Sequence, residues 1–424
     1  MAATTVGTVQ TGRTDGGAAE ARGAATGISG TRAVRVLRCD GSVRAVRLVA
    51  RALVVALDGG PAVLPVPDAA VVERDRLLTA AAPDAGTDAA LLVATSGSAG
   101  EPKVVELSAS ALIASARATH DRLGGPGGWL LALPVRHIAG LQVLVRSELA
   151  GVEPVVLDLS GGFRAEAFAA AAAAVSGRLG RRYTALVPTQ LTRLLDAGGR
   201  ALDALRGFDA VLLGGAAAGP GLVERAVRSG VRVVTTYGMT ETAGGCVYDG
   251  VALPGVRVRV DAERRVHLAG PMLADGYRLR PELTAAAFAG GWFRTGDVGR
   301  IQADGTLDVL GRADDLIVTG GEKVPPALVE RALDASPTVA ESCVVGIADA
   351  HWGQLVAAAV VAAPGSAPDV AELRASVRER VGPTAVPKLV EVVPSLPTRG
   401  IGKVDRDAVQ RYLTERHVER SRSV

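Results

Sequence analysis

The sequence predicts an α/β protein: a large N-terminal α/β domain with parallel sheets, then a β subdomain and a small C-terminal α+β domain. Short apolar runs alternate with helix-forming segments between residues 91 and 236, which is typical of a largely parallel sheet covered by helices. From Gly255 onward, alternating apolar and polar residues indicate strands with one buried face. After Arg312, helical and strand segments are mixed in a compact unit.

In the large domain, turn residues mark the ends of the expected strands and helices. Leu91–Thr95 is an apolar run that leads into a glycine loop, and a helix is expected from Ser108 to Arg122, with Ser108 or Ser110 as its N-cap. The further apolar runs, each bounded by turn residues, are 129–133, 154–159, 183–187, 209–213 and 231–236. The helical segments between them are 164–179, 189–197 and 220–229.

The remaining elements follow a different pattern. Strands are expected at 256–260 and 265–268 in the β subdomain. The C-terminal unit is predicted to contain helices at 325–335 and 369–381 and strands near 341–347, 355–363 and 388–393. The change in composition puts the domain boundary near Arg312 to Asp315. Residues 1–30 are rich in Gly, Ala and Thr, and we expect them to be disordered.

The composition excludes several classes of function. The net charge is +3 with dispersed basic residues, and aromatic residues make up 3%, so nucleic acid is not an expected partner. No apolar run reaches the length of a transmembrane helix, and the N-terminus lacks a secretion-signal pattern. Cys39, Cys246 and Cys343 lack metal-ligand spacing, so they are predicted to be buried small hydrophobic residues in a reducing cytoplasm.

Lysine is rare in this chain. The 47 basic residues include only four lysines, namely Lys103, Lys323, Lys388 and Lys403. A compact ammonium on a flexible stem is not interchangeable with a guanidinium group. Three of these lysines, all but Lys388, lie beside glycine clusters, where backbone amides can approach an anion closely. The alternative is that the four lysines remain by chance. The position of three of them beside glycines favours anion binding.

The glycine loop reads Thr95-Ser-Gly-Ser-Ala-Gly-Glu-Pro-Lys103. It is not the loop of a P-loop NTPase, because Lys103 follows Pro102 rather than standing in a Gly-Lys-Ser/Thr sequence. It is not a serine-hydrolase elbow either, because Ser96 occupies the position where that motif requires glycine. A generic surface loop is the alternative. Small residues, hydroxyl groups and one lysine together suit a phosphate group.

Further motifs follow in order along the chain. They are Tyr237-Gly-Met-Thr-Glu-Thr242, Trp292-Phe-Arg-Thr-Gly-Asp-Val-Gly299, Gly311-Arg-Ala-Asp-Asp-Leu-Ile-Val-Thr-Gly-Gly-Glu-Lys323 and Gly402-Lys-Val-Asp-Arg406. Together with the glycine loop, and in this order and spacing, they resemble the acyl-adenylate-forming superfamily. That superfamily includes acyl-CoA synthetases, luciferases and nonribosomal adenylation domains. The resemblance covers residues from about 88 to 406.

The resemblance implies an ATP site. Tyr237 would pack on adenine, Thr240 would bond the α-phosphate and Glu241 would hold Mg²⁺, which prefers carboxylate and phosphate oxygens. Asp297 would accept hydrogen bonds from the ribose hydroxyls, and Arg312 would support the ribose. The residues implied to cradle the β- and γ-phosphates are Thr95, Ser96, Gly97, Ser98, Gly100 and Lys103.

The resemblance also implies a separate role for each domain. Residues 31–312 would form the ATP- and acid-binding domain, and residues 313–424 a small mobile domain that carries the catalytic Lys403. Asp314 would be the hinge. Lys403 would reach the α-phosphate and the substrate carboxylate together. Gly320 and Gly321 would line the path of the CoA thiol.

The segment from Trp129 to Ser147 resembles 2-succinylbenzoate–CoA ligases of menaquinone biosynthesis, as does the short N-terminal region. In that interpretation His137 is a catalytic residue beside the substrate carboxylate, and Arg146 with Ser147 belongs to the acid pocket. A core histidine hydrogen-bonded to the backbone is the alternative for His137. Gly214, Gly215 and Ala216 would form a small-residue wall beside a flat aromatic ring, or an ordinary strand-to-helix turn.

These implications together predict a cytoplasmic, AMP-forming acid–CoA ligase that converts 2-succinylbenzoate, an aromatic diacid, with ATP, Mg²⁺ and CoA. The alternatives are another acyl- or aryl-CoA synthetase, an adenylation enzyme that loads a carrier protein, and an ATP-binding protein without catalysis. The retention of Lys103, Glu241 and Lys403 in a lysine-poor chain disfavours the last. A homodimer is compatible with the sequence.

Overall fold

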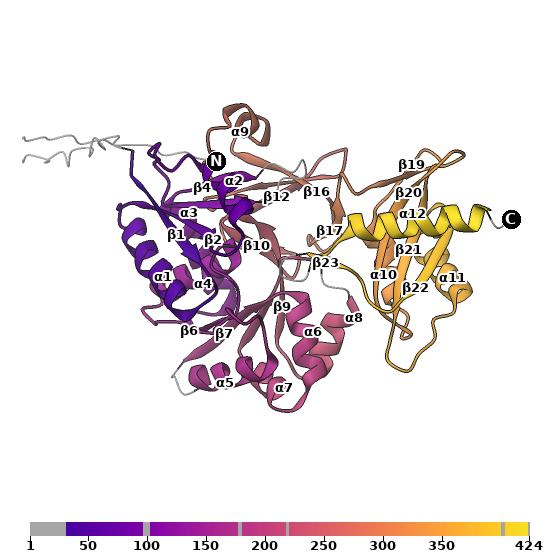
Figure 1. Ribbon diagram of the computed structural model, residues 1–424, viewed down its shortest axis with the longest axis horizontal. Coiled ribbons are helices and arrows are strands. Elements are labelled where there is room, and N and C mark those ends of the chain that lie inside the picture. Colours follow the sequence, from indigo (N-terminus) through magenta and orange to yellow (C-terminus); the bar gives the residue numbers. More distant parts are fainter. Residues whose placement is uncertain (1–30, 96–101, 177–179, 218–219, 400–402, 423–424) are drawn as a thin grey trace, which may run out of the picture.

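The computed structural model describes residues 31–95, 102–176, 180–217, 220–399 and 403–422 (Figure 1). The segment 1–30, for which the sequence predicts disorder, lies outside the described residues. The first sheet has the strand order β1-β2-β3-β4-β14, with β1 to β3 parallel and the last two strands antiparallel. Its strands are β1 Val34–Cys39, β2 Ala62–Pro67, β3 Leu91–Thr95, β4 Lys103–Leu107 and β14 Gly276–Tyr277.

The second sheet has the order β11-β10-β9-β8-β7-β5-β6, and its strands from β9 to β6 run parallel. These are β5 Gly127–Leu131, β6 Val155–Val156, β7 Arg181–Leu186, β8 Ala210–Leu213 and β9 Val233–Met239. Two antiparallel strands, β10 Gly244–Tyr248 and β11 Val251–Ala252, extend it at one edge.

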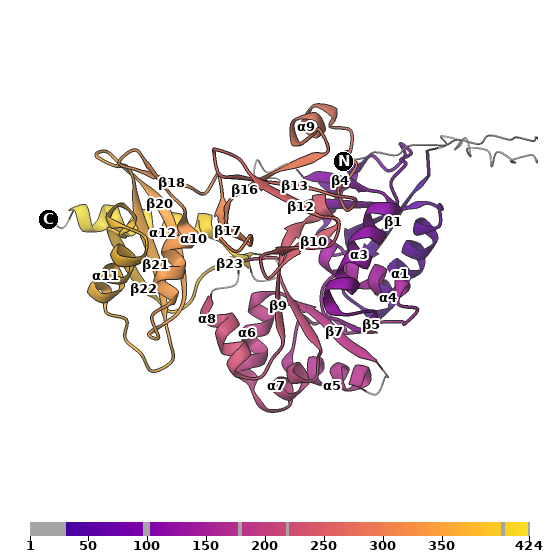
Figure 2. The same cartoon turned by 180° about the vertical axis from the view of Figure 1, so that it is seen from behind.

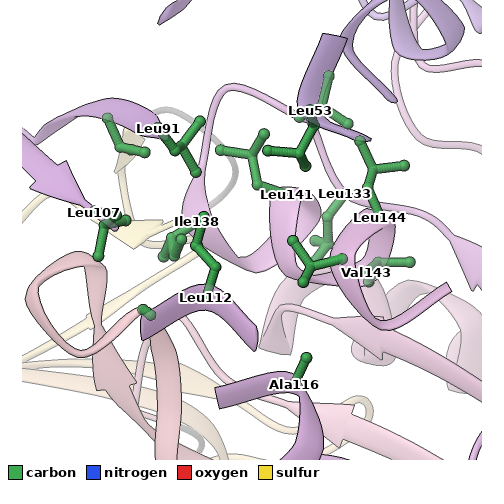
Figure 3. Packing of buried hydrophobic residues seen from close by; sticks show 14 of the residues in the cluster. Leu53, Leu91, Leu107, Leu112, Ala116, Leu133, Ile138, Leu141, Val143 and Leu144 are labelled. Carbon is green, nitrogen blue, oxygen red and sulfur yellow. The ribbon is translucent and has the colours of Figure 1, made fainter. Parts of the chain in front are cut away.

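Helices separate and cover the two sheets. The largest core cluster joins both sheets to three helices between them, α1 Val43–Leu57, α3 Ala109–Leu123 and α4 Ile138–Leu149. Figure 3 shows Leu53, Leu91, Leu112 and Leu141 converging there from α1, β3, α3 and α4. The outer layers are α2 Val71–Ala81 on the first sheet, and α5 Ala165–Ser176, α6 Pro188–Ala197, α7 Gly199–Arg206 and α8 Pro220–Arg228 on the second.

The β subdomain follows as an antiparallel sheet of order β12-β13-β16-β15, with β17 also paired to β16. Its elements are β12 Arg257–Val260, β13 Arg265–Ala269, α9 Pro281–Ala287, β15 Phe288–Ala289, β16 Trp292–Ile301 and β17 Leu307–Arg312. A one-turn helix, η1 Thr240–Thr242, joins the end of β9 to β10. Tyr237 and Met239 of β9 pack against the core of this subdomain, so the subdomain lies beside the end of β9.

The small C-terminal domain packs two cores against the two faces of one sheet of order β19-β18-β21-β20, with β22 beside β21. Figures 1 and 2 show this domain beside the large one, with β23 at the junction between them. Its elements are β18 Ile317–Thr319, β19 Glu322–Val324, α10 Pro326–Asp334, β20 Val339–Asp349, β21 Gly353–Ala362, α11 Val370–Arg380, η2 Pro383–Ala385, β22 Leu389–Val393, β23 Thr398–Arg399, β24 Lys403–Val404 and α12 Arg406–Arg422.

The predicted fold class is confirmed, and three details are corrected. The strand expected at 154–159 is only Val155–Val156, while β9 extends beyond its predicted end to Met239 because it pairs with β10. Cys39 is half-buried rather than buried, unlike Cys246 and Cys343. Within the described parts of the chain, no helix is both long and apolar enough to span a membrane.

Candidate active site

Several predicted site residues of the large domain lie where strands of the second sheet end. His137 follows β5, Gly214 follows β8, Tyr237 lies near the end of β9, and Glu241 follows β9 in η1. Parallel strands present their carboxyl ends at one edge, which is where open α/β sheets bind ligands. The β subdomain brings Asp297 and Arg312 to the same edge.

Tyr237, Asp297 and Arg312 form one polar group. The Tyr237 hydroxyl donates to Oδ2 of Asp297 at 2.8 Å, and Nη1 of Arg312 lies 3.7 Å from Oδ1 of the same carboxylate. Burial and the Asp297 carboxylate raise the pKa of Tyr237 well above its ordinary value, so the hydroxyl stays protonated and can donate. The group presents an aromatic ring, a carboxylate and a guanidinium together.

Local backbone structure fixes that carboxylate. Asp297 and Arg312 are direct cross-strand partners on β16 and β17. The Asp297 N–H donates to Thr295 Oγ1 at 3.0 Å, and the Thr295 hydroxyl donates to the Val266 carbonyl at 2.8 Å. Gly296 lies directly under the guanidinium of Arg312, because a Cβ there would come within 2.6 to 2.8 Å of its atoms. The glycine of the Arg-Thr-Gly-Asp sequence thus makes room for Arg312.

Glu241 lies in η1, next to the buried Thr240. Its Oε1 accepts a hydrogen bond from the Tyr277 hydroxyl at 2.9 Å. Burial raises the pKa of Glu241, while the Tyr277 hydrogen bond and the positive charges of Lys103 and Arg312 oppose that rise. The Tyr277 hydroxyl thus donates to the carboxylate, and two cations act on it.

Lys103 begins β4, opposite Thr95 at the end of β3. The Thr95 hydroxyl donates to the Lys103 carbonyl at 3.4 Å, and Lys103 Nζ lies 5.6 Å from the centre of the Tyr277 ring. The rest of the predicted phosphate loop, Ser96, Gly97, Ser98 and Gly100, lies outside the described residues. The strand pairing still brings both ends of this loop to the edge that holds Glu241.

His137 stands at the N-cap position of α4. Burial, and secondarily the charge of Arg136, lower its pKa to about 4, so the imidazole is neutral at neutral pH. Gly214 lies against Thr236, since a Cβ at Gly214 would meet Thr236 Oγ1 at 2.2 Å. Gly215 has a φ of +80°, and a Cβ there would lie 3.2 Å from Cγ1 of Val187. Ala216 continues this small-residue turn after β8.

Arg146 and Ser147 are not brought together with His137. They lie about nine residues farther along α4, roughly 13 Å at 1.5 Å per residue. Arg146 is buried with its guanidinium 5.2 Å from the centre of the Trp129 ring system, and its Nη2 donates to the Tyr248 hydroxyl at 3.5 Å. Their role in the acid pocket stays a prediction.

The C-terminal site residues occupy two places. Lys403 lies in β24, which pairs with β23 at the junction of the domains. Asp314 is exposed, and its Oδ2 lies 3.7 Å from Nη2 of Arg312. Gly320 and Gly321 form the β18–β19 turn with φ values of +57° and +83°, and Gly320 packs on the Trp352 ring. Figures 1 and 2 show this turn at the side of the small domain remote from β9.

Sequence reasoning missed two residues of the site, Tyr277 and Thr295. Tyr277 is buried and contacts both Glu241 and Lys103, and Thr295 orients the backbone of Asp297. Tyr277 is one of five tyrosines in the chain, and that scarcity was the only available signal. Its contact with Glu241 joins positions 36 residues apart.

The comparisons with known proteins agree with this geometry. The model of the AMP-binding enzyme family matches residues 21–281, and that of the AMP-binding enzyme C-terminal domain matches residues 328–403. A probable 2-succinylbenzoate–CoA ligase from Mycobacterium tuberculosis is 50% identical over 334 residues, which cover 77% of this chain and 86% of the relative.

Two solved structures show the same architecture. ATP-bound MatB from Rhodopseudomonas palustris aligns with a TM-score of 0.77 at 26% identity, over 91% of this chain and 90% of that one. The o-succinylbenzoate CoA synthetase from Bacillus subtilis, in complex with its acyl-adenylate intermediate, aligns with a TM-score of 0.68 at 26% identity, over 89% and 88%. The chain therefore belongs to the AMP-binding enzyme family of acyl-adenylate-forming ligases.

Proposed function

We propose that this chain is an ATP-dependent, AMP-forming 2-succinylbenzoate–CoA ligase. The observation that carries the proposal is the group of Lys103, Glu241, Tyr237, Asp297 and Arg312 near the end of β9, in a chain 50% identical over 334 residues to a probable ligase of that name. The group offers positive charge for phosphates, a carboxylate for a metal ion, and a carboxylate for sugar hydroxyls. These are the needs of a bound nucleotide.

The first half-reaction makes a poor electrophile reactive. A carboxylate oxygen of the acid attacks the α-phosphorus of ATP, the bond to the bridging oxygen breaks, and pyrophosphate leaves. Two anions must approach each other, so a cation is needed between them. In our proposal Lys403 supplies that cation from the small domain, Thr240 bonds the α-phosphate, and Lys103 with the loop after Thr95 holds the outer phosphates.

Magnesium would be held by Glu241. The carboxylate accepts a hydrogen bond from Tyr277, and Mg²⁺ at nucleotide sites is usually bound by one or two protein carboxylates together with substrate phosphates. Among the described residues, no group of three or more His, Cys, Asp or Glu side chains could hold a metal ion alone, which fits a site completed by the nucleotide. When bound, the ion would neutralise charge on the phosphates.

The second half-reaction transfers the acyl group. The CoA thiol attacks the carbonyl carbon of the adenylate, and AMP leaves. We propose that the small domain, residues 313–424, turns about Asp314 against residues 31–312, so that Lys403 withdraws and the Gly320-Gly321 turn lines the thiol path. Both glycines have positive φ, which suits a tight turn without side chains beside a ligand.

The acid pocket would lie between His137 and the turn of Gly214, Gly215 and Ala216. A neutral imidazole can hydrogen-bond to the substrate without placing a second charge there. Gly214 itself packs against Thr236, where the Cβ of any other residue would collide. The turn would therefore present a wall without large side chains to the acid.

A panel of acids tests the substrate. AMP formation with CoA present should show the highest kcat/KM for 2-succinylbenzoate, compared with benzoate and medium-chain fatty acids. A site that pairs a second carboxylate should discriminate by a large factor, since an analogue without it leaves polar groups unpaired. A preference for benzoate or a fatty acid would support another acyl- or aryl-CoA synthetase. Adenylation without CoA thioester formation would support loading of a carrier protein.

A further inference from the structure

Tyr277 lies between the two charges of the candidate nucleotide site. Its hydroxyl donates to Oε1 of Glu241 at 2.9 Å, and its ring faces Nζ of Lys103 at 5.6 Å from the centre. One side chain thus contacts the carboxylate through its polar end and the ammonium through its π face. An ammonium over an aromatic ring is an attractive arrangement of its own.

The two charges would otherwise attract each other directly. A buried carboxylate and a nearby ammonium attract each other more strongly than the same charges do in water, because the protein interior screens them less. Yet within the described parts of the chain no ion pair joins Glu241 to Lys103, although the Lys103 charge acts on Glu241. A direct pair would use up the carboxylate that a metal ion needs and the cation that phosphates need.

Tyr277 is held rigidly in this place. Its strand pairs with β4, the strand that begins with Lys103, so Tyr277 stands opposite Val105. The Tyr277 N–H donates to Thr284 Oγ1 at 2.9 Å, and its ring packs edge-on against Phe288.

The next residue anchors the same backbone. Arg278 is buried and donates to Glu106 Oε1 at 2.9 Å and to the Ala82 carbonyl at 3.1 Å. It also donates to the Ala81 and Ala85 carbonyls. The backbone at Tyr277 is therefore tied to two neighbouring segments.

We propose that Tyr277 is a positioning residue that keeps Glu241 and Lys103 from pairing, so that each is free for its own ligand. The inference rests on the proposed nucleotide site. It assigns the two ends of the tyrosine separate tasks. The hydroxyl orients the carboxylate for the metal ion, and the ring occupies the path by which the carboxylate would reach the ammonium.

Two substitutions separate these tasks. Tyr277→Phe keeps the ring and removes the hydroxyl, so binding of Mg²⁺–ATP should weaken about 10-fold, as for other groups that orient a metal ligand. Binding of ATP in EDTA should change little. Tyr277→Leu removes ring and hydroxyl, so Glu241 should pair with Lys103, and ATP in EDTA should also bind about 10-fold more weakly.

Isothermal titration calorimetry on the full chain measures both affinities without any turnover. The matched control is Tyr183→Phe, because Tyr183 is a buried tyrosine whose hydroxyl donates to the Gly125 carbonyl at the same 2.9 Å, away from the site. The control should lose comparable thermal stability and keep both ATP affinities.

A second substitution tests whether Tyr277→Leu weakens ATP binding because Glu241 pairs with Lys103 or because the fold is damaged. If Glu241 neutralises Lys103 in Tyr277→Leu, then adding Glu241→Gln should restore the affinity for ATP in EDTA. No restoration, or a Tyr277→Leu variant that binds as the wild type does, would overturn the inference. A wild-type chain that binds no ATP with or without Mg²⁺ would overturn the proposed function itself.

Discussion

Burial, more than any neighbouring charge, sets the protonation of His137. Its pKa of about 4 lies below the ordinary value of 6.5, and the charge of Arg136 acts in the same direction. A neutral imidazole at the start of α4 can hydrogen-bond to an acid without becoming its counter-ion. Positive charge for the reaction must then come from lysine and arginine.

This shift predicts a pH dependence of stability. Between about pH 4 and 6.5 the unfolded chain would carry a proton on His137 that the folded chain does not, so stability should fall as pH falls through that window. Thermal unfolding of wild type and His137→Gln at pH 7.5 and 5 measures it. The variant should lose less than the wild type. His351→Gln, at an exposed histidine, is the control, and equal losses in wild type and His137→Gln would show that the imidazole is not held neutral.

Some residues of the site could be identified in the sequence, and others could not. Tyr237, Asp297 and Arg312 lie in motifs that resemble a family, and the structure brings them together. Tyr277 lies in a strand of two residues, and its contacts arise only when β14 joins β4. Local patterns carry no information about such a contact. The placement of Arg146 was also beyond the sequence, because arginine is common throughout the chain.

At the scale of elements, the β16–β17 hairpin aligns two polar side chains of the candidate site. It sets Asp297 opposite Arg312, and Gly296 lets the guanidinium lie over the backbone. The guanidinium is the flexible end of a partly exposed side chain, so it can move aside if the space is filled. We expect that movement to leave the stability of the fold nearly unchanged and to weaken ligand binding at the site.

Gly296→Ala should therefore weaken ATP binding while thermal stability changes little. The added methyl group would displace Arg312 from Asp297, and loss of one charge-assisted contact corresponds to about 10-fold in affinity. Calorimetric titration with Mg²⁺–ATP and a melting curve measure the two effects. Gly161→Ala is the control, because a Cβ there meets nothing within 4 Å. Unchanged ATP affinity in Gly296→Ala would mean that Arg312 does not act from this position.

The N-terminal elements show what sequence reasoning overlooked. The unit from β1 to α2 was not predicted, although Val43–Leu57 carries a helical pattern with Ala45, Val46, Val49, Leu53 and Ala56 buried. That periodicity was a usable signal. The edge strand β1 was harder to recognise, because its burial does not alternate strictly. Most strands and helices between 91 and 236 were predicted because turn residues bound each of them.

For the whole molecule, the arrangement of the domains matters most. Arg331 of α10 donates to Asp308 Oδ1 at 2.6 Å and to the Val309 carbonyl at 2.7 Å, which ties the small domain to β17. Arg406, which begins α12 after Lys403, pairs with Glu330 at 2.8 Å. The segment that carries Lys403 is thus anchored within the small domain, and the small domain is anchored to the large one. A rotation of the small domain would have to break the Arg331 contacts.

We propose that this chain makes an acyl-adenylate with a lysine that its small domain delivers. Lys403→Ala, measured separately in the two half-reactions, tests it most directly. Pyrophosphate release from acid and ATP should fall by about 10²–10³-fold, the scale of losing one charge that stabilises a transition state. Thioester formation from supplied acyl-adenylate and CoA should fall far less, and Arg411→Ala on the exposed face of α12 should leave both intact. Equal losses in both half-reactions, or adenylation at the wild-type rate, would contradict the account.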